Sequence, residues 1–466
     1  MSDHILVPFA GEDSGTAGLT WGQWDIWPAM RDEKASFSVG GWLPLPTGTT
    51  VHDVASDLAF LLHRYPALRT RLRFTDDGCL QQVVAQAGEV ALAIVDAGAA
   101  DPAQVAAELY QRYDSYVFDE TREWPIRWAV VVSAGAVTHL VSVISHLVVD
   151  GPSVVTMLQD LAARDPVSGA AVGPVTALQP LALARWQTSP AGRRKSDAAL
   201  RHWDRLLRSV PARRFAGSSD PRQPPYWQLL YDSPASYLAS VLLAARTGTS
   251  TSTVLLAAFA VVITRATGIS PAVVQIVVNN RFRRDIAGTV SPLCEPIPCV
   301  IDATSGSFDE VVGRAWQQAI GAYRLSYYDP RQRAELITRI GRERGEEVDL
   351  DCILNDRRAL NPQEAAGDPP TPAQVRAALE RSELTWGWRK EIPGKNLIMH
   401  VNDVPDTVSY DLCVNTRYLS PADMESCLRG LEALLVEEAL EVPNRAAPPG
   451  HKPCATVAAG PDEETT

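Results

Sequence analysis

The 466-residue sequence lacks the signals of a membrane or exported protein. It has no uncharged apolar run of about eighteen residues, the length that a transmembrane helix needs. Its N-terminus, MSDHILVPFAGEDSG, has no basic stretch followed by an apolar one, as a secretory signal would have. Both classes are therefore excluded, and we expect a cytoplasmic protein with no membrane partner.

The sequence also lacks metal-binding and common hydrolase patterns. Its seven cysteines are an odd number, form no CxxC pair and have no histidine at ligand spacing. Reduced thiols fit this pattern better than disulfides or a structural zinc. No Gly-x-Ser-x-Gly elbow, Walker loop or HExxH helix is present. We expect no metal and no resident cofactor.

Positive charge is in deficit, with 43 basic and 55 acidic residues and a formal net charge of −12. A broad nucleic-acid surface needs clustered positive charge, so we expect no nucleic-acid partner. The most basic stretch contains Arg193, Arg194 and Lys195, with Arg201 nearby. This stretch is either a solvated helix face or a docking patch for an acidic partner, and both interpretations remain open.

Helical and strand patterns alternate along most of the chain, whose length exceeds that of one ordinary hydrophobic core. Helices are predicted over 51–65, 102–113, 152–163, 196–209, 251–267, 308–323 and 421–438. Strands are predicted over 68–74, 80–84, 126–132, 138–144, 272–278, 299–302, 350–354, 396–401 and 407–414. The fold class is therefore α/β, with two sandwich-like subdomains over 1–175 and 176–442. The Pro-, Ala- and acid-rich tail over 443–466 is predicted to be disordered.

The segment 138–161, THLVSVISHLVVDGPSVVTMLQDL, holds the strongest candidate for chemistry. An apolar strand leads into His146, and Asp150, Gly151 and Pro152 then open a helix. A helix N-terminus offers free N–H groups to a developing oxyanion, while an imidazole can move a proton. The alternative is a buried histidine on a loop that an aspartate caps, and the spacing alone does not separate the two.

Several motifs in order resemble the condensation-domain superfamily of nonribosomal peptide synthesis. The segment SHLVVDG over 145–151 is similar to that family's H-H-x-x-x-D-G signature. Further similar segments are LTWGQWDIW (19–27), RYPALRTR (64–71), FDETREWPIRW (118–128) and the helix–strand–Asn-Arg pattern over 251–281. The resemblance covers nearly all of the chain except its tail.

The resemblance implies two chloramphenicol-acetyltransferase-like halves in a V around a tunnel. A donor acyl group would arrive on the phosphopantetheine of a carrier protein acting in trans, or on coenzyme A. A small amine, or a second carrier-bound acceptor, would enter from the opposite side. His146 would position the acceptor or take its proton. The N–H of Gly151 would assist the oxyanion.

The resemblance also implies that Asp150 pairs with an arginine and holds the loop. Arg281 of the Asn-Arg motif is the first candidate and Arg69 the second. Ser145 departs from the family, because it stands where the first histidine of the signature would orient the loop.

The segment 285–300, DIAGTVSPLCEPIPCV, also differs from the sequence that the family usually has at this place. This difference is expected to change the tunnel floor. Candidates for tunnel-lining side chains are Asn280, Glu295, Asn355 and Trp386. Core packing is an equally good interpretation for the aromatic residues Trp386, Trp388, Tyr327 and Tyr328.

The expected activity is amide formation between a carrier-bound acyl or aminoacyl thioester and an amine. Ester formation with a hydroxyl acceptor is a close variant. The alternative from another class is a noncatalytic platform that binds carrier proteins and recruits tailoring enzymes. Ser145 and the altered floor favour the platform, whereas His146, Asp150 and Gly151 favour catalysis.

Overall fold

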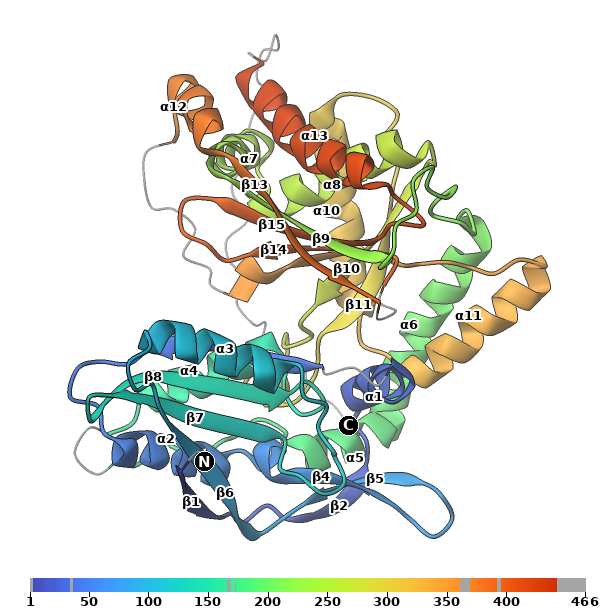
Figure 1. Ribbon diagram of the computed structural model, residues 1–466. Helices are drawn as coiled ribbons and strands as arrows, with labels where there is room; N and C mark the ends of the chain where they lie inside the picture. Colours follow the sequence, from blue (N-terminus) through green and yellow to red (C-terminus); the bar gives the residue numbers. More distant parts are fainter. Residues whose placement is uncertain are drawn as a thin grey trace.

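The computed structural model describes residues 3–33, 37–165, 169–171, 173–360, 369–391 and 395–441. These residues form two α/β lobes (Figure 1), and the predicted α/β fold class is confirmed. The predicted disordered tail over 443–466 lies outside the described residues, as does part of the predicted boundary around 164–175.

The first lobe is built on a five-stranded sheet with strand order β1-β6-β7-β8-β3. Its strands are β1 (Asp3–Ala10), β6 (Ala87–Asp96), β7 (Ile126–Ser133), β8 (Ala136–Ser145) and β3 (Ser38–Pro44). Helices α2 (Val51–Arg64) and α4 (Gly151–Ala162) share one apolar core with the sheet, and α3 (Pro102–Asp114) packs in another with β7 and β8. A second sheet contains β2 (Gly15–Gly18), β5 (Leu80–Val84) and β4 (Thr70–Phe74). The five-stranded sheet places the C-terminal end of β8 beside α4, the helix that follows it in the chain.

The second lobe is built on a seven-stranded sheet with strand order β11-β10-β12-β14-β15-β9-β13. Its strands are β11 (Glu295–Ile301), β10 (Ala272–Val278), β12 (Cys352–Asp356), β14 (Leu397–Asn402), β15 (Val408–Asn415), β9 (Tyr226–Ser233) and β13 (Glu383–Lys390). Its apolar core contains residues of α7 (Pro234–Thr247), α8 (Thr251–Thr267), α10 (Phe308–Leu325) and α13 (Pro421–Leu440). Most of α8 is buried, as expected for a helix that is apolar all round.

Helices α1 (Trp21–Glu33), α5 (Pro180–Thr188), α6 (Pro190–Ser209) and α11 (Pro330–Arg344) lie where the two lobes meet (Figure 1). The shorter helical segments are α9 (Arg284–Ala287), α12 (Pro372–Ala378), η1 (Pro66–Arg69), η2 (Arg357–Leu360) and η3 (Leu379–Arg381). Among the described residues, no single helix has the length and apolarity to cross a membrane. Only α7 and α8 taken together pass that test, and they are bent by 105°.

Most predicted elements match an observed one, and the differences have local causes. Residues 68–69 belong to η1, because Pro66 favours a helical first position after α2 ends. Strand β11 begins at Glu295 rather than Cys299, despite Pro296 and Pro298. It lies at the edge of the sheet and pairs only with β10, so the missing N–H groups of its prolines are tolerated.

A segment of the second lobe reaches into the first. Val290 is fully buried in the core of the first lobe. Two residues further on, the backbone of Pro292 passes Gly22 of α1 so closely that a Cβ on Gly22 would lie 2.1 Å from the carbonyl oxygen of Pro292. The lobes are also tied by an ion pair between Asp25 of α1 and Arg333 of α11, at 2.6 Å. We call residues 289–294 the bridging segment.

Candidate active site at the junction of the two lobes

His146 lies directly after β8, on the turn that leads into α4. Its backbone N–H donates to the carbonyl of Phe37 at 2.9 Å, and the N–H of Ser145 donates to the carbonyl of Pro125 at 2.8 Å. The neighbouring Ser145 and Leu147 are buried, whereas the His146 side chain is only half-buried. The backbone is thus fixed on both sides while the imidazole remains accessible.

The hydrogen bond of the imidazole identifies its tautomer. His146 Nδ1 lies 2.8 Å from the carbonyl oxygen of Val149, which can only accept. Nδ1 therefore carries the hydrogen in the neutral ring, and Nε2 has the free lone pair. This arrangement gives a proton acceptor at Nε2 on a ring whose orientation is set by its own loop.

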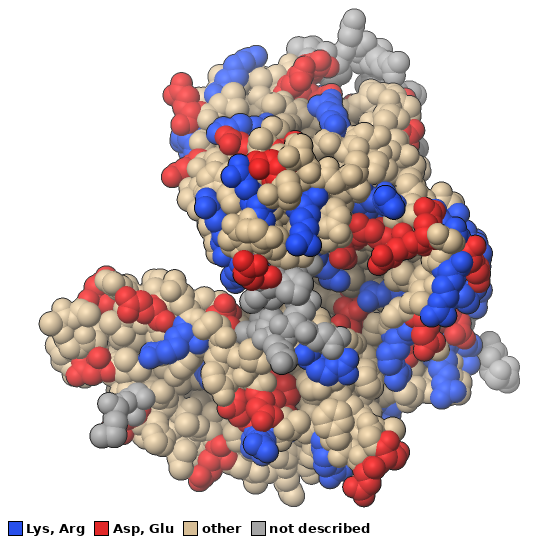
Figure 2. Space-filling view, turned by 45° about the vertical axis from the view of Figure 1, so that its right-hand side comes forward, with Lys and Arg blue, Asp and Glu red and all other residues tan. Residues whose placement is uncertain are grey.

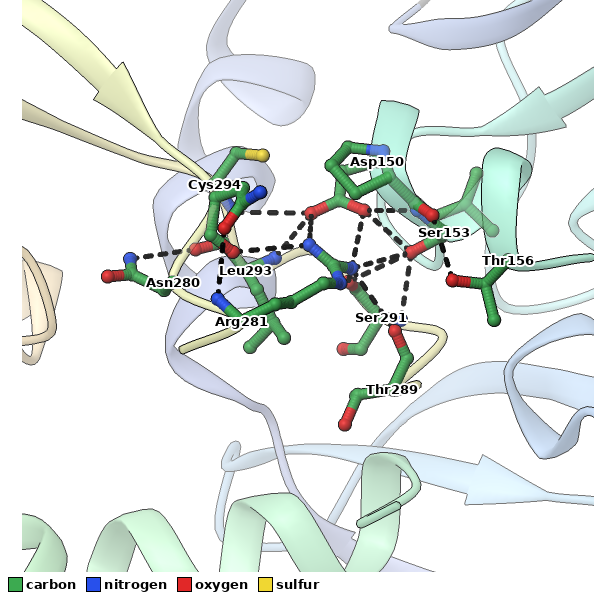
Figure 3. Close-up of polar contacts among 12 residues, drawn as sticks. Asp150, Ser153, Thr156, Asn280, Arg281, Thr289, Ser291, Leu293 and Cys294 are labelled. Atoms are coloured by element: carbon green, nitrogen blue, oxygen red, sulfur yellow. Dashed lines mark hydrogen bonds and ion pairs between the residues drawn. The ribbon is translucent and has the colours of Figure 1, made fainter. Parts of the chain in front are cut away.

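Asp150 caps α4 and at the same time binds the second lobe (Figure 3). Its Oδ1 accepts from the N–H of Ser153 at 2.9 Å and from the hydroxyl of Ser153 at 2.6 Å. Its Oδ2 accepts from the N–H groups of Leu293 and Cys294 in the bridging segment, at 2.9 and 3.2 Å. One carboxylate therefore holds a helix terminus and a strand-to-strand connection of the other lobe.

Arg281 completes this cluster with a two-pronged ion pair. Its Nη1 and Nη2 donate to the two carboxylate oxygens of Asp150, at 2.9 and 2.7 Å. Nη2 also donates to the carbonyls of Thr289 and Ser291 in the bridging segment, at 3.1 and 3.0 Å. Burial on its own would raise the pKa of Asp150, but the charge and hydrogen bonds of Arg281 outweigh it and lower the pKa to about 2. Asp150 is therefore a permanent carboxylate with a binding role.

The predicted pair between Asp150 and Arg281 is thus present in the structure. The second candidate, Arg69, was wrong. It is buried in the first lobe, where its guanidinium donates to the backbone carbonyls of Asp13 and Ala85. Gly151 is the first residue of α4, so its N–H belongs to the end of the helix that has no intrahelical partner.

Sequence reasoning missed the partner of Ser145, which is Glu120. The Ser145 hydroxyl donates to Glu120 Oε1 at 2.5 Å, and both side chains are buried. Burial is the main cause that raises the pKa of Glu120 to about 7. Glu120 stands among Asp119 and Glu123 in an acidic stretch, so nothing in the sequence marked it as the buried member.

Glu120→Gln is expected to be more stable than the wild type above pH 7. Folded Glu120 keeps its proton up to about pH 7 but loses it near 4.5 when unfolded, so stability falls as the pH rises through this window. The gap between these two pKa values corresponds to about 3 kcal/mol. Glutamine stays neutral, so urea unfolding of the two proteins should agree near pH 4 and diverge increasingly up to pH 8.

The exposed Glu108 on α3 supplies the control for this measurement. Glu108→Gln should follow the wild type at every pH. A Glu120→Gln variant that also follows the wild type would show that Glu120 is not a buried acid.

The four candidate tunnel residues lie in different surroundings. Asn280 is buried with a φ of 57°, and its amide donates to the carbonyls of Leu293 and Ser326 at 2.9 and 3.2 Å. It therefore ties the bridging segment to the end of α10. Trp386 packs against Trp227 and the core of the second lobe, with ring centroids 5.5 Å apart. The core interpretation is favoured for Trp386.

Glu295 and Asn355 are held very differently. Glu295 is only 1% exposed, and its carboxylate oxygens have no hydrogen-bond partner in the described part of the chain. Burial raises its pKa well above the ordinary value, with a further contribution from Asp25. Asn355 is half-buried on β12, where its amide donates to His400 Nδ1 at 3.2 Å. Burial lowers the pKa of His400 to about 3, so that ring is neutral.

The described residues contain no group of three His, Cys, Asp or Glu side chains that could hold a metal ion. The space-filling view shows an open notch between the two lobes (Figure 2). A separate groove of about 670 Å³ lies between α6 and α11. It contains Arg201 of the predicted basic cluster, but acidic residues such as Asp204 and Glu335 also line it. The groove is therefore mixed in charge.

Comparison with known proteins gives one consistent family. The family model described as "Condensation domain" matches residues 27–346. The AMB antimetabolite synthetase AmbB of Pseudomonas aeruginosa is 25% identical over 299 residues, which are 62% of this chain and 23% of that protein. The chain thus spans about a quarter of the length of this curated relative.

Solved structures agree on the fold. The condensation domain that releases the chain from the enacyloxin polyketide synthase has a TM-score of 0.66 and 21% identity, with 94% of this chain and 85% of that chain covered. The X-domain of teicoplanin biosynthesis has a TM-score of 0.66 and 18% identity, with 91% and 94% covered. SgcC5 of Streptomyces globisporus has a TM-score of 0.64 and 17% identity, with 91% and 98% covered.

Proposed function

Since this chain belongs to the condensation-domain family, we propose that it is an acyltransferase of nonribosomal peptide or polyketide biosynthesis that forms an amide. Its donor is an acyl or aminoacyl thioester on the phosphopantetheine of a carrier protein. Its acceptor is a small amine or a second carrier-bound amine. The observation that carries the proposal is the accessible imidazole of His146, with its Nδ1 bound to Val149 and its Nε2 free to accept a proton.

Because Nδ1 of His146 donates to Val149, Nε2 is the atom that can accept a proton in the reaction. The acceptor nitrogen attacks the thioester carbonyl, the new C–N bond forms, and the C–S bond breaks. Nε2 of His146 takes a proton from the nitrogen and returns it to the departing thiolate, so that the free thiol of the carrier leaves. Gly151 lies at the N-terminus of α4, where a free N–H stabilises the oxyanion of the tetrahedral intermediate.

Asp150 and Arg281 serve the reaction without touching the reacting atoms. Their buried pair fixes the end of the loop that carries His146 and joins it to the bridging segment. Coenzyme A as donor and a hydroxyl acceptor, which would give an ester, are variants of the same chemistry. None of these variants needs a metal or a resident cofactor.

A noncatalytic platform is the second candidate function. Ser145 departs from the family signature, and the fold is shared with the X-domain of teicoplanin biosynthesis, which has also been solved in complex with OxyB. A platform would bind carrier proteins and recruit a tailoring enzyme.

The two functions are separated by a turnover assay. The chain is incubated with a carrier domain loaded with an acyl or alanyl thioester and with a panel of primary amines and amino alcohols, and products are read by mass spectrometry. Amide or ester formed faster than without the chain supports the acyltransferase. Saturable carrier binding with no product across the panel overturns it in favour of the platform, and the absence of both overturns both functions.

A further inference from the structure

We infer that Glu120 and Ser145 are positioning residues that hold the loop of His146. They act in place of the orienting histidine that the family signature has at position 145. The inference rests on the proposed role of His146 and adds a residue, Glu120, from a distant part of the chain.

The Ser145 hydroxyl makes two hydrogen bonds of opposite direction. It donates to Glu120 Oε1 at 2.5 Å and accepts from the N–H of Leu147 at 3.3 Å. The residues on either side of His146 are thus linked through one side chain. Because that side chain is fully buried, no water can replace either bond without a shift of the loop.

Glu120 is itself anchored to the first lobe. Its backbone carbonyl accepts from the N–H of Leu72 in β4 at 2.7 Å. Its side chain is 5% exposed, which is rare for a glutamate. A series of hydrogen bonds therefore connects the fixed backbone of Glu120, through Ser145, to the loop that carries the imidazole.

The direction of the hydrogen bond depends on the state of Glu120. As a carboxylate it can only accept, so Ser145 must donate to it and keeps a lone pair for Leu147. As a neutral acid it can instead donate to Ser145, which leaves the hydroxyl hydrogen of Ser145 without Glu120 as its acceptor and replaces a charge-assisted hydrogen bond by a weaker neutral one. The ionised form of Glu120 therefore holds the loop more firmly than the neutral form.

The charges around Glu120 decide which form is present. The acids Glu123 and Asp119 disfavour a second negative charge, and Arg127 favours it. Arg127 is engaged with Glu123 at 2.9 Å and stacks on Tyr116. With burial as the largest influence, the pKa of Glu120 rises to about 7, so the two forms exchange near neutral pH.

The test compares Ser145→Ala, Glu120→Ala and Glu120→Gln with the wild type, and uses Glu108→Gln as the control. The first measurement is the ¹⁵N spectrum of histidine-labelled protein, assigned for His146 with a His146→Gln variant. The wild type and Glu120→Gln should show His146 protonated at Nδ1 alone, because a glutamine carbonyl also accepts from Ser145. The two alanine variants should show exchange between tautomers.

The second measurement is the kcat for the reaction identified in the turnover assay. We expect the alanine variants to lose on the order of ten- to a hundredfold in kcat with little change in KM. The rise of kcat with pH near 7 should shrink in Glu120→Gln, which holds Ser145 as a donor at every pH.

An unchanged His146 tautomer together with an unchanged kcat in both alanine variants would overturn the inference. A chain with no turnover at all would count against the proposed function, but the spectrum of His146 would still decide whether Glu120 and Ser145 position it. Circular dichroism of each variant separates a shifted loop from an unfolded chain.

Discussion

Asp150→Ala is expected to destabilise the protein by about 3–5 kcal/mol and to abolish turnover. The substitution removes the carboxylate that pairs with Arg281 and that accepts from the N–H groups of Leu293 and Cys294. It leaves a guanidinium buried without its counter-charge, which costs far more than the loss of one surface ion pair. The two lobes also lose the contact that joins α4 to the bridging segment, so the turn of His146 should loosen.

Asp101 provides a matched control, because it also caps a helix, α3, with its side chain and is also followed by a proline within the first two positions of the helix. Asp101 is exposed, and its side chain makes its capping hydrogen bond to Ala103 of the same lobe. Asp101→Ala should therefore cost only the value of a cap, about 1 kcal/mol, and leave activity unchanged. Urea unfolding of both variants checks the difference, and equal losses would show that the pair of Asp150 and Arg281 adds nothing beyond capping.

A double-mutant cycle isolates the pair itself. Arg281→Met alone should be strongly destabilising, since it leaves the Asp150 carboxylate buried without its ion-pair partner. Asp150→Asn combined with Arg281→Met removes both charges, so its loss should be smaller than the sum of the two single losses. Additive losses would contradict a direct interaction at 2.7 Å.

The same pair sets a pH limit on stability. The pKa of Asp150 is about 2 in the folded state, and an ordinary aspartate titrates near 4. Its contribution is complete above pH 4 and is lost as the pH falls towards 2. The Asp150→Asn variant should therefore lack part of the acid sensitivity that the wild type shows in this window.

The sequence sufficed for the fold class and for the central pair. Nearly continuous apolar sequence identified α8 and β10 with their observed bounds, because both are buried along most of their length. Asp150 was readable as a cap because it directly precedes Gly151 and Pro152. Arg281 followed from a motif, since nothing in the spacing of two residues so far apart could show that they meet.

Other features depended on tertiary contacts that no local pattern records. Glu120 is one of three acids in the five residues 119–123, and only the fold decides that it faces Ser145 while Glu123 faces Arg127. The bridging segment looked irregular because its residues satisfy their hydrogen bonds with Asp150 and Ser153 of the other lobe. Trp386 shows the converse, because an aromatic residue in a strand has the same sequence pattern whether it lines a tunnel or a core.

His146→Ala is expected to lower kcat by about 10²- to 10⁴-fold, the usual contribution of a general acid–base. Stability should change little, because the half-buried ring makes one hydrogen bond, to the carbonyl of Val149 in its own loop. This combination separates His146 from Asp150, whose loss affects folding and activity together. Single-turnover rates on the acyl-loaded carrier measure the first effect, and thermal unfolding measures the second.

His52, exposed in the first turn of α2, is the control for a histidine outside the site, and His52→Ala should turn over like the wild type. Full turnover in His146→Ala would show that the imidazole takes no part in the mechanism, even if the loop has shifted. An intermediate result also has a definite meaning. If His146→Ala and Ser145→Ala each lose activity but the double variant loses no more than His146→Ala, then Ser145 acts only through His146, because effects within one catalytic unit are not additive.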